Sequence, residues 1–433
     1  MAVTSLRGEV TDLLSRLIQV DTTNPPGNET AAAELLRDYL ESNGVECELY
    51  ARVPERANLV ARIRGRGDGP SLLFLGHTDV VLADAGEWSV PPFSGQVRND
   101  EVWGRGALDM KGQVAANAVA IASLAREGFE PSGDLILAAT ADEEVGENFG
   151  LSWLCSEHPD AVRCDYAINE GAGDRLVLGG SAFYVAATAE KLTAPFMIRV
   201  HGRSGHASMP GIADNALVKA ARLIERIAAY RPQPQIQEEV EVFLRAVLGD
   251  LPAATDVVAR AGAVDKTVAE LVEPLLAPTF SPTIISASRK RNVIPALCEI
   301  EVDCRLLPGQ SWAEIEAVVR GVLGDDVDYD LTFLKAEGGT RSALDTPLWS
   351  ALESFVEETE PGARAVPMIC AGFTDSHWLR DAFGTVAYGF FPLRTMPAEV
   401  AATLIHSADE RAAIDDVELG VDWLRFAART VLA

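Results

Sequence analysis

One acidic residue lies in a glycine-rich segment whose backbone can hold it in a defined place. Asp109 is part of residues 104–112, GRGALDMKG, and has Gly104, Gly106 and Gly112 around it. Glycine permits tight turns and lets the backbone come close to neighbouring strands. A carboxylate held in this way can serve two metal ions at once. If Asp109 bridges two zinc ions, the chain must supply a histidine, further carboxylates and a general base elsewhere.

A histidine follows the first short apolar run of this kind. Residues 71–75, SLLFL, are typical of a strand buried on both faces, and His77 comes directly after them and Gly76. In open α/β sheets the ligand sites lie beyond the carboxyl ends of the strands. Asp79 can accept the ring N–H that a metal does not use, and so orient His77. The alternative is a histidine that only hydrogen-bonds its neighbour, because His-x-Asp alone is a weak motif.

Acidic residues follow two further predicted strands. The acids at 142–144 come after the apolar run 135–140, and Glu170 comes after the run 164–169. Three successive carboxylates repel one another and lose solvation if they are buried without cations. A solvated loop is the alternative. The buried strand before these acids and Gly146 after them favour a site that cations neutralise.

The elements that position these residues alternate between helix and strand. Apolar residues recur at helical spacing over residues 4–20 and 29–43, before the first strands, and another helix follows Gly112. Acidic residues at 415–416 precede a final helix. The chain of 433 residues exceeds what one core usually holds, and its 48% apolar content supports two well-packed domains. We therefore expect an α/β protein of two domains.

Composition excludes several classes of partner. There are 37 Lys and Arg residues against 64 Asp and Glu, for a net charge of −27, and no basic block appears. Nucleic acid and anionic membrane surfaces are poor partners for such a field. Without a basic leader or an apolar run long enough to span a membrane, we expect a soluble, cytoplasmic protein. The six cysteines contain no Cys-x-x-Cys pair, which favours buried free thiols over disulfides or a thiolate zinc site.

Taken together, the motifs resemble those of the metallopeptidase family that contains aminoacylase, glutamate carboxypeptidase, acetylornithine deacetylase and succinyl-diaminopimelate desuccinylase. Their order and approximate spacing match over nearly the whole chain, in the segments GHTD at 76–79, GRGALDMKG at 104–112, DEEVG at 142–146 and HSADE at 406–410. The resemblance implies a di-zinc exopeptidase-like catalytic domain with an inserted α+β lid domain of the dimerisation type. We expect the catalytic domain over residues 1–180 and 340–433, and the lid over residues 181–339.

The resemblance also assigns the metal site, with two Zn²⁺ per chain and Co²⁺ or Mn²⁺ as possible replacements. Asp109 becomes the bridging ligand, and the peptide bond after it is expected to be cis. Each zinc has two further ligands, which are His77 and Glu170 for one ion and Glu144 and His406 for the other. These imidazole and carboxylate ligands suit zinc. Glu143 would be the general base, and Asp79 would support the reaction by orienting His77.

The lid would add three residues from the segments 202–210, 291–295 and 303–309. His206 would hydrogen-bond the developing oxyanion, in several relatives from the partner subunit of a homodimer formed through the lid. Asn292 would lie near the scissile group, and Arg305 could form a fork onto a substrate carboxylate. A turn histidine and a surface arginine are the alternatives. His377 replaces an arginine of the family pattern, so recognition of the substrate end stays open, and no role is assigned to the extra lid segment at about 231–282.

The implied function is hydrolysis of an amide or peptide bond in a small N-acyl amino acid or peptide by metal-activated water. Relatives that act on free N-termini usually carry Asp where this chain has Glu170, which favours an acylated or blocked amine. A carboxypeptidase or dipeptidase remains the alternative to a deacylase. A metal-free binding protein with the same fold is more distant, because every ligand and the base are present.

Overall fold

The computed structural model describes residues 5–146 and 148–433, and the chain divides into two compact units. The first unit comprises Met1–Thr188, Ser342–Met368 and Thr374–Ala433, and the second comprises Ala189–Arg341 and Ile369–Phe373. The sequence places the boundaries at 180/181 and 339/340, whereas the structure divides the chain at 188/189 and 341/342. The second unit is therefore inserted into the first.

A nine-stranded sheet forms the centre of the first unit, with the order β1-β2-β6-β3-β7-β19-β9-β18 and with β8 paired to β9. Strands β6, β3, β7 and β19 are parallel neighbours, and β1, β2 and β9 join antiparallel. The strands are β1 (Glu46–Ala51), β2 (Ala57–Ile63), β3 (Leu72–His77), β6 (Leu135–Thr140), β7 (Tyr166–Asn169), β8 (Arg175–Leu178), β9 (Ser181–Glu190), β18 (Arg364–Cys370) and β19 (Val386–Gly389). The predicted strand over 135–140 coincides with β6.

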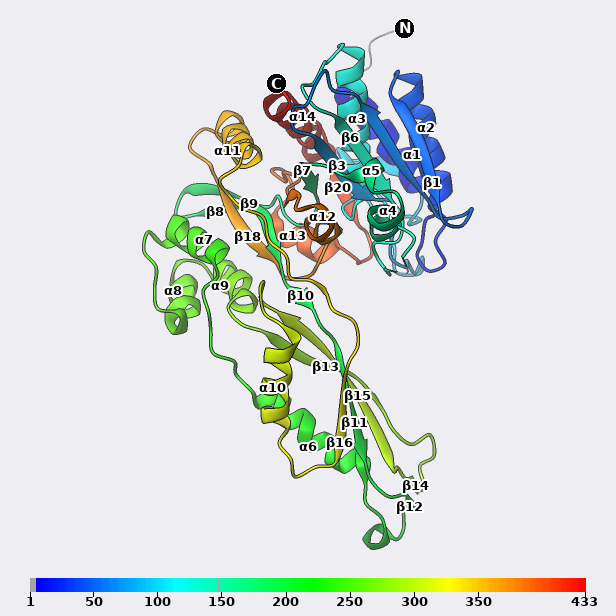
Figure 1. Cartoon of the computed structure of the whole chain (residues 1–433), viewed down its shortest axis with the longest axis vertical. Helices are drawn as coiled ribbons and strands as arrows, with labels where there is room; N and C mark the ends of the chain where they lie inside the picture. Colours follow the sequence, from blue (N-terminus) through cyan, green and yellow to red (C-terminus); the bar gives the residue numbers. More distant parts are fainter. Residues whose placement is uncertain (1–4, 147) are drawn as a thin grey trace. The chain divides into compact units, whose positions relative to one another are not determined.

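Helices cover both faces of this sheet because its central strands are apolar on both sides (Figure 1). Along β3, Leu72 and Phe74 pack into one core and Leu73 and Leu75 into another, as the two-residue period of a strand requires. The first core is covered by α1 (Leu6–Gln19), α2 (Glu29–Ser42), α3 (Lys111–Arg126), α11 (Pro347–Thr359) and α14 (Ile414–Val431); the second is covered by α4 (Leu151–Glu157), α5 (Pro159–Val162) and α12 (Ser376–Phe383). The predicted α/β class is confirmed.

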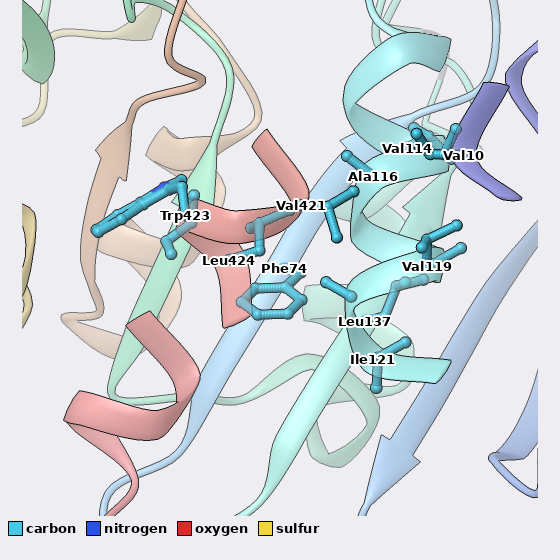
Figure 2. Packing of buried hydrophobic residues seen from close by; sticks show 14 of the residues in the cluster. Val10, Phe74, Val114, Ala116, Val119, Ile121, Leu137, Val421, Trp423 and Leu424 are labelled. Atoms are coloured by element: carbon cyan, nitrogen blue, oxygen red, sulfur yellow. The ribbon is translucent and has the colours of Figure 1, made fainter. Parts of the chain in front are cut away.

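Helix α3 is the most deeply buried helix that bears on the site, since every residue from Lys111 to Leu124 is buried. Its small residues let it pack tightly between the sheet, α1 and α14, and Figure 2 shows Val114 and Val119 in the same cluster as Phe74 and Trp423. The helix comes so close to β3 that a Cβ at Gly76 would lie 2.9 Å from a methyl carbon of Val114. The start of α3, and with it Asp109, is therefore fixed against the end of β3.

The rest of the first unit consists of smaller pieces. A three-stranded sheet joins β20 (Arg411–Ala413) to β5 (Glu101–Trp103) and β5 to β4 (Gln96–Arg98). Helix α13 (Ala398–Leu404) precedes His406. The pairing of β20 with β5 ties the segment after His406 to the segment before Asp109, although about 300 residues separate them in sequence.

The second unit is a six-stranded antiparallel sheet with helices packed on it. Residues of β15 alternate between buried and less buried positions, and the buried ones pack against α6 and α10. Its elements are β10 (Leu192–Thr193), β11 (Phe196–His201), β13 (Thr279–Ser286), β15 (Leu297–Leu306), β16 (Tyr329–Phe333), β17 (Glu337–Gly338), α6 (Ala216–Ala229) and α10 (Trp312–Leu323), with a separate pair of β12 (Gly205–His206) and β14 (Val293–Ile294).

The extra segment at about 231–282 forms three helices, α7 (Glu238–Leu248), α8 (Val257–Val264) and α9 (Lys266–Val272), and leads into β13. Their apolar faces are buried, for example at Phe243 and Val272. The buried side chain of Lys191 donates hydrogen bonds to the carbonyl oxygens of Pro274 (2.7 Å) and Ala277 (3.0 Å). These hydrogen bonds hold the end of the helical segment against the connection between β9 and β10.

Two sequence expectations concern the chain as a whole. All six cysteines are free and either buried or half-buried, as predicted. Among the helices of the described residues, none combines the length and the apolar character that crossing a bilayer requires.

Candidate metal centre

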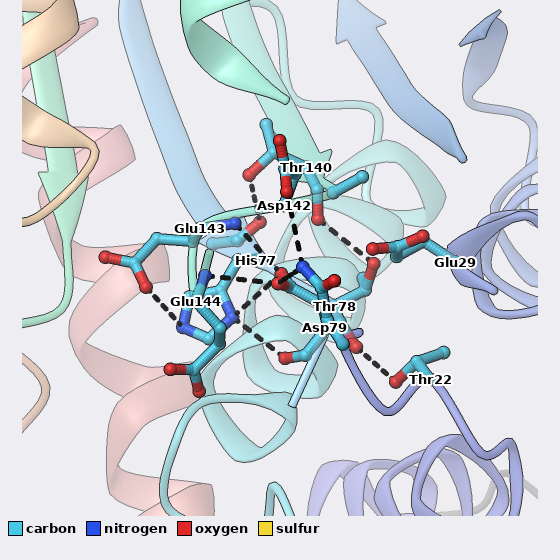
Figure 3. A network of polar contacts seen from close by, with 12 residues as sticks. Thr22, Glu29, His77, Thr78, Asp79, Thr140, Asp142, Glu143 and Glu144 are labelled. Carbon is cyan, nitrogen blue, oxygen red and sulfur yellow. Dashed lines mark hydrogen bonds and ion pairs between the residues drawn. The ribbon is translucent and has the colours of Figure 1, made fainter. Parts of the chain in front are cut away.

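Three parallel strands bring the predicted ligands to one edge of the first sheet. His77 is the last residue of β3 and lies opposite Thr140, the last residue of β6, while β7 ends at Asn169. The acids at 142–144 and Glu170 therefore emerge beside His77, as the strand-end argument predicts. Figure 3 shows His77 between the turn that carries Glu143 and Glu144 and the residues that follow β3.

The carboxylate of Asp109 lies between two imidazole rings. Its Oδ1 is 3.1 Å from Nε2 of His77, and its Oδ2 is 3.0 Å from Nε2 of His406. A carboxylate that presents a different oxygen to each of two histidines has the arrangement of a bridging ligand. The peptide bond between Asp109 and Met110 is cis, as expected.

Two further carboxylates complete a symmetrical set. Oε1 of Glu170 is 3.6 Å from Nε2 of His77, and Oε2 of Glu144 is 3.4 Å from Nε2 of His406. Glu143 lies beside the first histidine, with Oε2 at 3.9 Å from its Nε2. Ligand atoms of His77, Asp109 and Glu144, and likewise those of His77, Glu143 and Glu170, lie within 4.8 Å of one another. The structure thus brings all five predicted ligands and the predicted base together.

The carboxylates of this cluster repel one another, so a bound cation would stabilise their charged forms. Burial and the neighbouring carboxylates raise the pKa of Glu170 to about 7 and that of Glu143 well above its usual value. Hydrogen bonds to Asp109 and Glu144 raise the pKa of His406 to about 10. Half-buried acids with raised pKa values beside histidines with raised pKa values are expected of ligands that are arranged to share a cation.

The donor set fits a pair of divalent cations. Two imidazoles and three carboxylates are ligands that zinc, cobalt and manganese accept. Oε1 of Glu144 is buried and has no hydrogen-bond partner among the described residues, so it is available to a cation. The residues present therefore fit the two metal ions that the sequence implies.

Asp79 supports the site in two ways. Nδ1 of His77 lies 3.0 Å from the backbone oxygen of Asp79 and 3.4 Å from its carboxylate, so the ring N–H is held by the residue that the sequence proposes, chiefly through the main chain. The Asp79 carboxylate also accepts hydrogen bonds from the backbone N–H of Glu143 (3.2 Å) and Glu144 (3.1 Å) (Figure 3). One residue orients both a ligand and the turn that carries the base.

Asp142 does not take part in the cluster, which corrects its grouping with the two acids that follow it. Its carboxylate accepts hydrogen bonds from the Arg56 guanidinium and the Asn24 amide (both 3.3 Å), and from the backbone N–H of Phe149 (3.0 Å). Arg56 in turn forms a bidentate ion pair with buried Glu29 (2.6 and 2.7 Å). The cation that neutralises Asp142 is therefore an arginine of the chain itself.

Glu410 is a supporting residue to which the sequence assigned no role. Its buried carboxylate accepts hydrogen bonds from the backbone N–H groups of Gly106 (3.1 Å), Leu108 (2.8 Å) and Asp109 (3.1 Å), and it pairs with Arg105 at 2.6 Å. The glycine-rich segment is thus organised around this carboxylate. Its place at the end of the segment HSADE was the only signal that pointed to it.

Asp375 is a second residue that sequence reasoning did not single out for the site. It is buried beside the cluster and accepts a hydrogen bond from the Thr140 hydroxyl at 3.1 Å. Burial, together with the charges of Asp79 and Glu170, raises its pKa to about 7. The nearby His377 is buried as well, with Nδ1 at 2.7 Å from the Thr374 carbonyl oxygen, as a residue packed at the start of a helix would be.

The three predicted lid residues lie in the second unit. His206 is paired with Val293 across β12 and β14, and the Ala207 N–H donates to the Asn292 carbonyl oxygen at 3.1 Å, so His206 and Asn292 are neighbours. Nδ1 of His206 accepts a hydrogen bond from the Ser208 N–H (3.2 Å), which leaves the ring proton on Nε2. Arg305 binds Asp303 (3.0 Å) and Thr193 within its own sheet.

Comparisons with known proteins agree with this geometry. The sequence pattern of peptidase family M20/M25/M40 matches residues 73–430. The chain is 28% identical over 424 residues to the succinyl-diaminopimelate desuccinylase of Cereibacter sphaeroides (strain ATCC 17025 / ATH 2.4.3), covering 94% of each protein. Its fold is similar to that of an M20 family metallo-carboxypeptidase from Sulfolobus solfataricus, with a TM-score of 0.73 at 18% identity over 98% of this chain and 99% of that one.

A third similar protein is described as binding metal ions. The YXEP protein of Bacillus subtilis, described as a dinuclear metal binding peptidase from the M20 family, has a TM-score of 0.62 at 14% identity, over 99% of both chains. The family match spans far more than half of the chain, and a half-buried acid between two histidines is an arrangement that suits a dinuclear centre. This protein is therefore a member of peptidase family M20/M25/M40, an enzyme of the metallopeptidase and amidohydrolase type.

Proposed function

We propose that this enzyme is a zinc-dependent hydrolase that cleaves the amide or peptide bond of a small N-acyl amino acid or peptide. Asp109 would bridge two Zn²⁺. The coordination of one ion would be completed by His77 and Glu170, and that of the other by Glu144 and His406. The observation that carries the proposal is the Asp109 carboxylate, which lies within 3.1 Å of an imidazole nitrogen on each side. The metal pair, when bound, lowers the pKa of water and polarises the scissile carbonyl.

Glu143 would act as the general base. It lies beside the ligands, 3.9 Å from Nε2 of His77, and its backbone N–H is held by Asp79. Burial and the Glu170 charge raise the pKa of Glu143, so this carboxylate has a stronger affinity for a proton than an exposed one. It would take a proton from water and later pass it to the leaving nitrogen. Asp79 would keep both His77 and Glu143 in place during these steps.

The second unit would supply the remaining groups. His206 would donate a hydrogen bond from Nε2 to the oxyanion, because its Nδ1 is already an acceptor for the Ser208 N–H. Asn292, its neighbour, would bind near the scissile group. The Arg305 guanidinium already donates hydrogen bonds to Asp303. It would bind a substrate carboxylate only if it gave up some of these bonds.

We further propose that two copies associate through the second unit as a homodimer. Strand β13 pairs with β15 alone among the described strands, and on it Ile284 and Ile285 are about half exposed. Leu217 and Val218 on α6 are exposed as well. An unpaired edge with apolar side chains suits strand addition by a second copy. Light scattering should give twice the chain mass, and Ile284→Lys should reduce it to one; a monomeric wild-type protein would refute the dimer.

The hydrolase proposal is tested by metal content and a substrate panel together. Protein purified without chelator should contain about two zinc ions per chain, and should hydrolyse members of a panel of N-acyl amino acids, dipeptides and C-terminally free peptides. Glu143→Ala should lower kcat by about 10²–10⁴ while the metal content stays at two, because Glu143 is the base and not a ligand. Glu157→Ala, at an exposed position of α4, is the matched control and should keep full activity.

The outcomes separate the alternatives. Faster cleavage of blocked amino acids than of free dipeptides would support the deacylase that Glu170 favours, and the reverse would identify a dipeptidase or carboxypeptidase. Protein without metal that hydrolyses nothing after zinc is added would contradict the enzyme and leave a binding protein of the same fold.

A further inference from the structure

A cavity of about 220 Å³ opens on the metal centre from within the first unit. Its walls come from the start of α3, the segment after β7, the segment after β19, helix α13 and the start of α14. Asp109 and Glu170 belong to its lining, so whatever fills the cavity lies directly against the proposed ligands. The mechanism above does not use this space.

The lining is apolar and carries no cation. Most of the lining residues are alanines and larger aliphatic or aromatic residues, such as Leu108, Phe391 and Ile405. Among the described residues that line the cavity there is no lysine, arginine or histidine, and the charged ones are all acids: Asp109, Glu170, Asp174 and Asp416. Asp416 is held by the backbone N–H groups of residues 394–396 (2.7–2.9 Å), so its carboxylate is already satisfied.

Two polar groups stand out in this apolar surface. Gln113, 3% exposed, has a buried Nε2 without a hydrogen-bond partner among the described residues. A buried amide donor without a partner is costly, and an acceptor on a bound molecule would satisfy it. Asp174 is half-buried, and burial raises its pKa to about 6. The side chains of the cavity thus offer a ligand one unpaired donor and no cationic group.

We infer that this cavity binds an uncharged apolar group next to the scissile amide, and that it rejects a carboxylate in the same place. The inference rests on the hydrolase function proposed above and names its substrate class. Apolar cavities of about 150 Å³ in proteins hold a benzene ring, so a space of about 220 Å³ accepts a group of butyl to phenyl size. A succinyl group would place its free carboxylate among apolar side chains and near Asp174, with no cationic side chain of the lining to pair with it, so it is disfavoured there.

The apolar group can belong to the acyl part of the substrate or to its amino-acid side chain, and the test separates these sources. One series extends the acyl chain on alanine, from N-acetyl through N-butyryl to N-valeryl. The other keeps the acetyl group and changes the amino acid from alanine to leucine to phenylalanine. In the series whose group enters the cavity, kcat/KM should rise about fourfold for each buried methylene, the ratio that corresponds to burial of one CH₂. N-succinyl-alanine should be at least a hundredfold poorer than N-valeryl-alanine, which has nearly the same length.

A variant that fills the cavity links the preference to this site. Ala402 lines the cavity from an exposed position of α13, so a larger residue can be introduced there without disturbing the core. Ala402→Phe should lower kcat/KM for the preferred long substrate at least tenfold more than for N-acetyl-alanine. Thr403→Phe, the next residue on the same exposed helix and not part of the lining, is the control and should leave the ratio unchanged.

Binding without turnover gives a second measurement. Calorimetry on zinc-loaded Glu143→Ala protein should detect N-valeryl-alanine binding, with Ala402→Phe weakening it in the double variant. Flat rates across both series, or a preference for the succinyl substrate, would overturn the inference even if hydrolysis is observed. Absence of all hydrolysis and of all binding by zinc-loaded protein would instead contradict the proposed function on which it depends.

Discussion

At the scale of single residues, the proposed metal ligands depend on groups outside the ligand set. The Glu410 carboxylate accepts hydrogen bonds from the backbone N–H groups of Gly106, Leu108 and Asp109 and pairs with Arg105. It is fully buried, so any donor left without it also lacks water. The segment that carries Asp109, the proposed bridging ligand, is therefore positioned by a carboxylate about 300 residues later in the chain.

Replacing Glu410 by glutamine should weaken metal binding without removing a ligand. The amide keeps one acceptor oxygen but turns an NH₂ group toward backbone N–H groups or Arg105. We expect zinc affinity, measured by competition with a chelator, to fall about 10–100-fold. Glu399→Gln, at an exposed position of α13, makes the same chemical change and should have no effect. An unchanged affinity in Glu410→Gln would show that the segment holds its shape without this carboxylate.

The sequence predicts the proposed ligands and the supporting Asp79, but not Glu410 or Asp375, and the reason is physical. His77, Glu144 and Glu170 each lie just after a buried strand, and an apolar run is visible in a single sequence. Asp142 follows the same strand as Glu144, so local pattern could not separate the two. Its partner Arg56 lies 86 residues earlier, and only the folded chain shows their contact.

At the scale of elements, the helices α7, α8 and α9 illustrate what pattern alone could not assign. The sequence marks residues 231–282 as an extra segment, but it does not show what holds the segment in place. Lys191 holds the end of the segment by donating to the carbonyl oxygens of Pro274 and Ala277, and burial lowers its pKa to about 8. Sequence patterns associate buried positions with apolar residues, so the burial of Lys191 could not be predicted from the sequence.

Lys191→Met should loosen this helical segment. Two carbonyl oxygens would lose their donors, and we expect the free energy of unfolding to fall by about 1–3 kcal/mol at pH 7. Hydrogen exchange should localise the loss to residues 266–278. Lys266→Met, at an exposed position of α9, is the control and should change stability little.

The same lysine predicts a pH dependence. Its pKa is about 8 in the folded chain against 10.5 in the unfolded one, so between these values the unfolded chain binds more protons and the stability contribution of Lys191 rises with pH. The free energy of unfolding, measured with denaturant, should therefore rise for the wild-type protein relative to Lys191→Met from pH 8 to pH 10. Taking the difference between the two proteins removes the contribution of the tyrosines. A constant difference over this range would contradict the lowered pKa.

At the scale of the whole molecule, the two units have separate cores. The clusters around Phe74 and around Ile300 share no residue, and the proposed metal ligands all belong to the first unit. The α/β class follows from the alternation of helices and strands in the sequence, whereas the inserted unit was expected from the resemblance to the metallopeptidase family. The exact junctions do not, because β9 continues from one unit into the next without a break in its pattern.

Removing the metals should therefore destabilise one unit and spare the other. A ligand that binds only the folded state adds RT ln(1 + [L]/Kd), about 4 kcal/mol at a thousandfold excess over Kd. Calorimetry with and without chelator should show one transition that moves down by several degrees and one that stays. Trp312 is the only tryptophan of the second unit, so the fluorescence change lost in Trp312→Phe identifies the stationary transition. Movement of both transitions together would mean that the units unfold as one.

The insertion of the second unit also sets an order in time. During synthesis the ribosome delivers His77, Asp109, Glu144 and Glu170 first, then the whole of residues 189–341, and only afterwards His406 and Glu410. Until the last part of the chain emerges, the acidic cluster has one imidazole, and the segment before Asp109 lacks the carboxylate that organises it. Helix α14, which covers α3, comes later still. The nascent chain must therefore carry an unfinished, mutually repelling set of acids, and metal insertion becomes one of the final events in the maturation of this enzyme.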